Sequence, residues 1–157
     1  MSSLAWPGTA TAPNPQRLAE IAAELVKGIW AKADDSKAPA TLFNFEKRLR
    51  IALLDEAKRL SGTTHDYSAK VMERWRISDD SISYIQRLRK TTAPDRLEKE
   101  AARVLFAQGQ ALTYQAAIFA FKKAMVLAAI EHCRGNHMAA ARLLGVSRNV
   151  IWTWKRK

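Results

Sequence analysis

The most constraining segment of this 157-residue sequence is residues 135–157, which has the pattern of two short helices joined by a tight turn. Asn136 stands where a side-chain oxygen caps the first helix, and Ser147 stands in the same position before the second. Gly145 lies between the two helices, where the turn needs a positive φ that costs glycine little. The spacing therefore predicts a helix–turn–helix unit in this part of the chain.

The apolar residues of the segment agree with that geometry. Ala140 and Ala141 are small enough to let the second helix approach closely, and Val146 is placed to pack beneath the turn. Ile151 and Trp154 are three residues apart, so they share the face of the second helix that turns back to the core. A unit of this shape can set its second helix in a DNA major groove, so DNA binding is the function that it predicts.

The segment resembles the Fis-type helix-turn-helix, which is found in the Fis nucleoid protein and at the C-terminus of many bacterial enhancer-binding regulators. Residues 117–123 resemble the long helix that precedes this motif, so the resemblance covers roughly residues 112–157 and leaves 1–110 uncovered. The chain departs from the family at Val150, Lys155 and Ala139, where threonine, leucine and a basic residue are usual. The matching positions are Gly135, Asn136, Ala140, Ala141, Leu143, Leu144, Gly145, Val146, Ser147, Arg148 and Ile151.

The resemblance implies a homodimer that presents two recognition helices to double-stranded DNA. By position it implies DNA contacts from Asn136, Ser147, Arg148, Trp152, Thr153, Arg156 and Lys157. From the residues themselves, Arg148 is the best candidate for reading a guanine edge, with a phosphate contact as the alternative. Asn149 is also placed to reach a base edge, whereas Lys155, Arg156 and Lys157 favour phosphates. Trp152 lies next to Ile151 and is expected either against the DNA backbone or over its own domain.

Positive charge is concentrated on the same segment. The chain has a net charge of +11, and residues 112–157 carry eight basic side chains against the single acid Glu131, a net +7. Residues 1–41 are neutral and residues 42–111 carry +4. A surface that binds phosphates needs this excess where the DNA-reading pattern lies.

The rest of the sequence predicts an all-α fold, an N-terminal helical bundle followed by the helix-turn-helix. Residues 1–13 are expected to form a flexible arm, and residues 14–110 a helical region of unknown role, for which dimerisation and partner binding are the candidates. Helices are expected near residues 14–33, 40–60, 66–76, 79–90, 95–108 and 113–134. No long stretch alternates with period two, so no sheet is expected.

The helix over residues 113–134 is apolar on two faces. Six positions follow the spacing of a helix that packs along another helix: Tyr114, Ile118, Phe121, Met125, Ala128 and His132. One face is expected to take the helix-turn-helix. The other needs either the upstream helices or a second copy of the chain, and the resemblance favours dimer contacts there.

A second, fainter helix-turn-helix pattern lies at residues 71–85. Ser78 is placed to cap its second helix, but Arg76 replaces the turn glycine. Asp79 and Asp80 put negative charge where a recognition helix would meet phosphates. We interpret this segment as two ordinary bundle helices.

Other functional classes lack their signatures. His132, Cys133 and His137 do not form a zinc site by spacing, since a turn separates the last from the first two. No phosphate-binding loop and no catalytic constellation is present, so neither a cofactor nor an enzymatic activity is expected. A single cysteine, no apolar run near the roughly 20 residues of a membrane span, and no secretory signal predict a cytoplasmic, nucleoid-associated protein.

The sequence thus predicts a sequence-specific, dimeric DNA-binding transcriptional regulator. Two alternatives stay open. One is an architectural protein that bends DNA, and the other is an interaction or accessory protein that the motif tethers to DNA.

Overall fold

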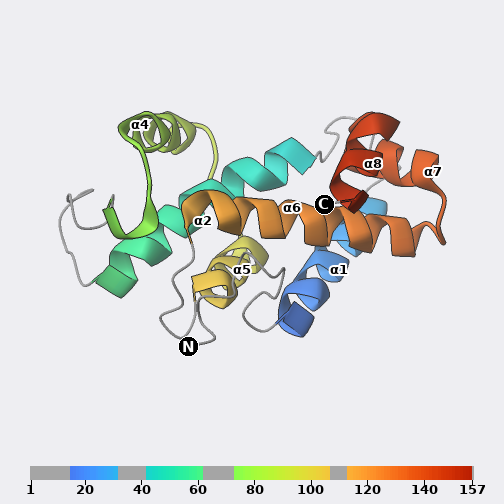
Figure 1. Cartoon of the computed structure of the whole chain (residues 1–157), viewed down its shortest axis with the longest axis horizontal. Coiled ribbons are helices and arrows are strands. Elements are labelled where there is room, and N and C mark those ends of the chain that lie inside the picture. The colour runs from blue at the N-terminus through green and yellow to red at the C-terminus, as the bar shows by residue number, and fades with distance from the viewer. Residues whose placement is uncertain (1–14, 32–41, 62–72, 107–112, 157) are drawn as a thin grey trace.

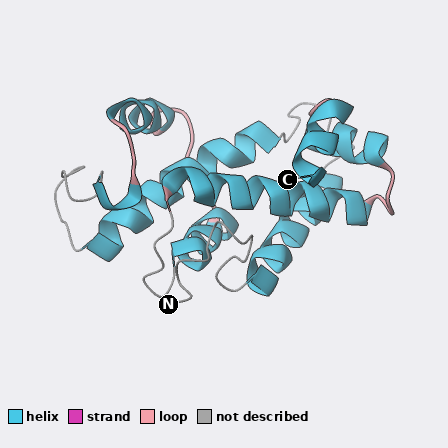
Figure 2. Cartoon of the chain, viewed as in Figure 1, coloured by secondary structure: helices cyan, strands magenta, loops and turns pink. Residues whose placement is uncertain are grey.

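The described parts of the chain are built of helices. The computed structural model describes residues 15–31, 42–61, 73–106 and 113–156 (Figure 1). All regular secondary structure within these ranges is helical (Figure 2), which confirms the all-α prediction. The principal helices are α1 (Pro15–Ala31), α2 (Leu42–Ser61), α4 (Asp79–Leu88), α5 (Arg96–Phe106), α6 (Tyr114–His132), α7 (His137–Leu144) and α8 (Arg148–Arg156).

The expected helices form within a few residues of their predicted limits. The exception is the helix expected near residues 66–76, of which 73–76 fall in a described range and 73–75 are helical. The predicted arm at residues 1–13 lies outside the described residues.

Local chemistry explains where several helices begin. The hydroxyl of Thr113 accepts the N–H of Ala116 at 3.1 Å and caps α6. At the start of α5, the carboxylate of Glu98 reaches back to accept the N–H of Asp95 at 2.8 Å, one half of a capping box. These bonds satisfy backbone donors that a helix start leaves without partners.

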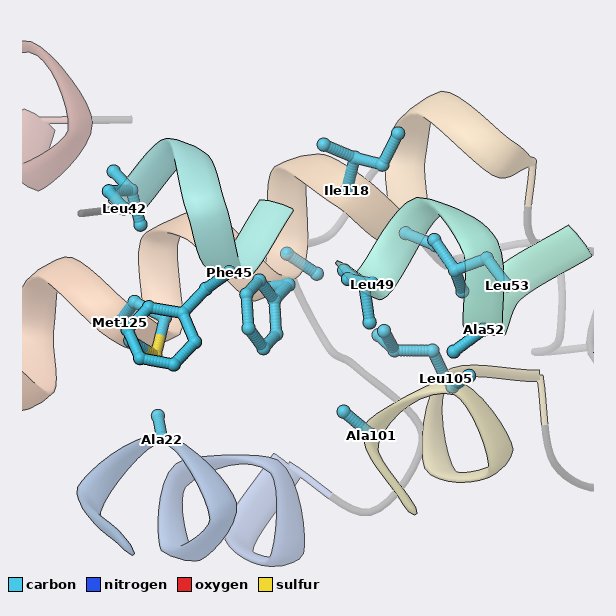
Figure 3. Packing of buried hydrophobic residues seen from close by; sticks show 14 of the residues in the cluster. Ala22, Leu42, Phe45, Leu49, Ala52, Leu53, Ala101, Leu105, Ile118 and Met125 are labelled. Atoms are coloured by element: carbon cyan, nitrogen blue, oxygen red, sulfur yellow. The ribbon is translucent and has the colours of Figure 1, made fainter. Parts of the chain in front are cut away.

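Helix α6 runs through the middle of the molecule and contacts α1, α2, α5, α7 and α8 (Figure 1). Figure 3 shows side chains of α1, α2 and α5 converging on those of α6, among them Phe45, Leu49 and Met125. Tyr114, Ile118, Phe121 and Met125, the first four positions of the expected seam, are all buried.

The chain's own helices therefore cover this seam. Of the two coverings that the sequence left open, the intrachain one is observed. One hydrophobic cluster continues from Leu18 in α1 to Ile151 in α8, so the helix-turn-helix and the upstream helices share a core.

An ionic cluster ties α2 to α6 at the edge of this core. The buried carboxylate of Glu46 accepts from Arg50 Nε at 3.0 Å through Oε2. Its Oε1 receives no well-directed hydrogen bond and is balanced by the ammonium of Lys122, 2.6 Å away. Arg50 also donates to the hydroxyl of Tyr114 at 3.0 Å. Burial raises the pKa of Tyr114 above its usual range, although the nearby Arg50 opposes that shift.

Candidate nucleic-acid interface

The turn between α7 and α8 has the geometry that the sequence predicted. Gly145 adopts the left-handed conformation, with φ of 67°, and the next N–H, that of Val146, donates to the carbonyl of Ala141 at 2.9 Å. The amide oxygen of Asn136 accepts the N–H of Ala139 at 3.1 Å and caps α7. The hydroxyl of Ser147 accepts the N–H of Val150 at 3.3 Å and caps α8. Both predicted caps are confirmed.

Helix α8 rests on an apolar platform. Ile151 is fully buried, as are Ala140 and Leu144 of α7. Trp154 packs at the edge of the platform, where its ring centroid lies 4.9 Å from that of Phe119 in α6. This packing fixes which side of α8 faces away from the protein.

The side of α8 that faces away from the platform is polar and accessible. Among the described residues of the predicted contact set, all are exposed to solvent: Asn136, Ser147, Arg148, Asn149, Trp152, Thr153, Lys155 and Arg156. Lys157 lies outside the described residues. Arg148 has no ion-pair partner within the described parts of the chain, so its guanidinium is available to a ligand.

Internal hydrogen bonds narrow what some of these side chains can offer to DNA. Thr153 donates its hydroxyl proton to the carbonyl of Asn149 at 2.8 Å, which leaves only acceptor capacity on that oxygen. The oxygens of Asn136 and Ser147 accept the capping bonds, so the groups that these side chains still have to donate to a ligand are the amide N–H of Asn136 and the O–H of Ser147.

Comparison with protein families agrees with this geometry. Residues 120–153 match the sequence model of a family described as bacterial regulatory protein, Fis family. The C-terminal segment is a Fis-type helix-turn-helix. Comparison of the chain with curated proteins and with solved structures gives no match. The matched residues run from residue 120, within α6, to the recognition helix α8, so the chain carries a DNA-binding motif with most of the long helix that precedes it.

The basic residues of the Fis-type motif do not all face outward. Lys122 belongs to the ionic cluster with Glu46 and lies 5.3 Å from the ring centroid of Trp154. Its charge therefore stabilises the contact between α6 and α2 and does not belong to the outward-facing basic surface. Arg142, Arg148, Lys155 and Arg156 are exposed on α7 and α8 and form the basic surface of the motif.

Sequence reasoning missed one residue of this surface. His137, at the start of α7, stacks on Trp152 with ring centroids 4.8 Å apart and an interplanar angle of 8°. Its Nε2 lies 3.3 Å from the ammonium of Lys155. In the sequence His137 stands out only beside His132 and Cys133, and its spacing from them argues against a zinc site; the described residues contain no group of three or more metal-ligating side chains. The contact joins residues 18 positions apart on different helices, so no local pattern signals it.

The second, fainter pattern forms a similar turn but presents a different surface. Arg76 has a φ of 54°, in the left-handed region, and Ser78 caps α4 by accepting the N–H of Ser81 at 3.1 Å. The positive φ at an arginine was not expected from the sequence. Trp75 and Ile77, on either side of Arg76, are both buried. Their burial favours this turn despite the cost of a left-handed conformation at a non-glycine residue.

Helix α4 packs on α2, at the end of the molecule away from α7 and α8 (Figure 1). Asp79 and Asp80 are exposed in its first turn, where carboxylates repel phosphates. We keep the interpretation that this segment is part of the bundle. No helix in the described ranges is long and apolar enough to cross a bilayer.

Proposed function

We propose that this protein is a sequence-specific transcriptional regulator that reads DNA with α8 as a dimer. The observation that carries the proposal is the exposed polar side of α8, held over the buried Ile151 by a turn of Fis-type geometry. The residues that we propose for contact are the described members of the predicted set, together with Lys157. No catalytic chemistry is part of the mechanism, in which basic side chains displace counterions from phosphates while α8 contacts base edges.

Arg148 is the side chain that we propose for base reading. It begins α8, and helix-turn-helix proteins contact bases with the N-terminal residues of the recognition helix. A bidentate arginine–guanine pair contributes about 1–3 kcal/mol of discrimination. Arg148→Ala should therefore weaken binding and relax preference at one base pair. Arg103→Ala, an exposed arginine of α5, is the matched control. An unchanged footprint and preference in Arg148→Ala would remove this residue from the reading role.

Dimerisation is proposed because one recognition helix contacts only a few base pairs, whereas paired half-sites about 34 Å apart give operator-level specificity. The seam of α6 is already filled, so a second copy has to contact another face. Sedimentation of the full chain, alone and with a duplex carrying two half-sites, measures the stoichiometry. A single copy per operator would contradict this part of the proposal.

The salt dependence of affinity tests the electrostatic part. With six to eight phosphates neutralised per dimer, affinity should fall on the order of a thousandfold between 50 and 200 mM salt. A flat response would contradict DNA binding through the basic surface of α7 and α8.

Selection of bound fragments from random DNA at physiological salt separates the regulator from its alternatives. A sharp consensus supports a regulator, and a broad AT-rich preference identifies an architectural protein. A partner that co-purifies in fixed proportion, together with no sequence preference, identifies a tethered accessory protein. The same proposal locates the protein on the nucleoid in the cytoplasm, which imaging of a tagged full chain tests.

A further inference from the structure

A contact between α7 and α8 holds two exposed side chains of the recognition helix next to a histidine of α7. The ring of Trp152 in α8 is stacked against His137 of α7, and the ammonium of Lys155 lies 5.3 Å from the centroid of the same indole. Lys155 and His137 are also within hydrogen-bond distance, with Nζ and Nε2 3.3 Å apart. His137, Trp152 and Lys155 thus form one three-residue cluster, which we call the stacked cluster.

The chemistry of the groups fixes the direction of the hydrogen bond. An ammonium has three donors and no acceptor, so Nε2 of His137 accepts and the imidazole carries its proton on Nδ1. One donor of Lys155 is used in this bond, and two remain. A lysine on a helix surface otherwise samples many rotamers, and it must lose that freedom when it binds a phosphate.

We propose that His137 is a positioning residue for DNA binding: it holds Lys155 in place so that the remaining donors of the ammonium bind one backbone phosphate, beside the indole of Trp152. This inference rests on the proposed function and adds a residue and a contact to it. Lys155 is exposed, and Trp152 keeps 44% of its surface accessible, so the stacked cluster is open to a ligand on its outer side.

The role of His137 is energetic rather than direct. Holding the lysine in place before binding reduces the entropy lost at the interface, which increases affinity without adding a protein–DNA contact. In this role His137 affects DNA affinity only through Lys155. Two substitutions separate the contributions. His137→Phe keeps a flat ring for Trp152 but removes the acceptor, and Lys155→Met keeps an unbranched side chain without the charge.

The experiment measures the affinity of the full chain for its selected duplex with His137→Phe, Lys155→Met and the double variant. Lys155→Met should reduce the slope of log K against log salt by about 1.8, the loss of one phosphate contact from each copy in the dimer. His137→Phe should weaken binding about threefold to tenfold for each copy in the dimer, the range for immobilising one long side chain. In the Lys155→Met background, His137→Phe should have no further effect.

A second measurement locates the phosphate. Duplexes in which one phosphate at a time is replaced by a neutral methylphosphonate should show one position in each half-site where the wild type loses affinity and Lys155→Met does not. At that position His137→Phe should lose less than the wild type. A residue with a merely structural role would not give this position-specific pattern.

The outcomes separate this inference from the proposed function. If the wild type binds DNA and Arg148→Ala weakens it, but His137→Phe binds as tightly as the wild type or adds its full effect to that of Lys155→Met, the positioning role is wrong. If the wild type shows no salt-dependent DNA binding, both proposals are overturned. Melting temperatures of the variants, measured in parallel, should stay close to that of the wild type, because Lys155 is exposed and His137 is only partly buried.

Discussion

Replacing Lys122 with methionine tests how the upstream helices hold the long helix of the DNA-binding motif. The ammonium of Lys122 is 2.6 Å from Glu46 Oε1, and the two side chains are 17% and 10% exposed. Oε1 has no other polar partner of good geometry, so Lys122→Met leaves a buried carboxylate oxygen without compensation. The methionine side chain keeps much of the apolar packing that the lysine stem provides beside Phe43 and Trp154.

The expected loss of stability follows from this geometry. Removing one partner of a fully buried ion pair costs about 3–5 kcal/mol. Here Arg50 still pairs with Oε2, and both partners keep some contact with water, so we expect about 2 kcal/mol. For a chain of this size that corresponds to a fall in melting temperature of about 4–8 °C.

Denaturant unfolding of Lys122→Met, Glu46→Gln and the double variant gives the coupling directly. Lys122→Met should cost much less in the Glu46→Gln background, where no charge is left unbalanced. Lys123→Met is the matched control, since it removes a neighbouring charge of α6 that pairs with no acidic group among the described residues, and it should change stability by less than about 0.5 kcal/mol. Equal costs in both backgrounds would refute the reasoning. DNA affinity below the melting range should not change, because the ammonium of Lys122 faces Glu46.

Three further predictions concern the turns and the buried tyrosine. Arg76→Gly should raise stability by about 0.5–1 kcal/mol, since glycine removes the cost of a left-handed conformation, whereas Lys99→Gly inside α5 should lower it by about 1 kcal/mol; equal signs in thermal melts would contradict this. Gly145→Ala should cost roughly 1–2 kcal/mol and weaken DNA binding, because φ at this turn is positive; wild-type melting and affinity would argue against the turn geometry. The pKa of Tyr114 is raised in the folded state, so its contribution to stability is present below about pH 10 and is lost as pH rises through the folded pKa. Stability measured between pH 9 and 11.5 should fall less steeply in Tyr114→Phe, and parallel curves would exclude Tyr114 as the titrating group.

The helices and the motif could be predicted because their signals are local. Asn136, Gly145 and Ser147 each act on backbone groups within a few residues, so their spacing alone specified two caps and a turn that the structure confirms. The buried stripe of α2, including Leu42, Phe45 and Leu49, follows from helical periodicity for the same reason.

Other features could not be predicted because they depend on residues far apart in the sequence. The left-handed conformation of Arg76 is one that arginine rarely adopts, and it accompanies the burial of Trp75 and Ile77 on either side. The stacked cluster and the pairing of Lys122 with Glu46 join residues on separate helices. From the charge of the sequence alone, Lys122 counts as part of the basic surface.

The sequence by itself determined that the chain is helical and that residues 135–157 form a helix-turn-helix with a basic, exposed recognition helix. Caps, turn glycine and apolar periodicity act over one or two helical turns, so they can be read without knowing the rest of the fold. Only the tertiary structure decided what covers the apolar seam of α6, because upstream helices and a second chain satisfy the same pattern equally well. Helices α1, α2 and α5 fill it, and the burial of Tyr114, Phe121 and Met125 within one chain is the physical reason that this face is closed to a partner.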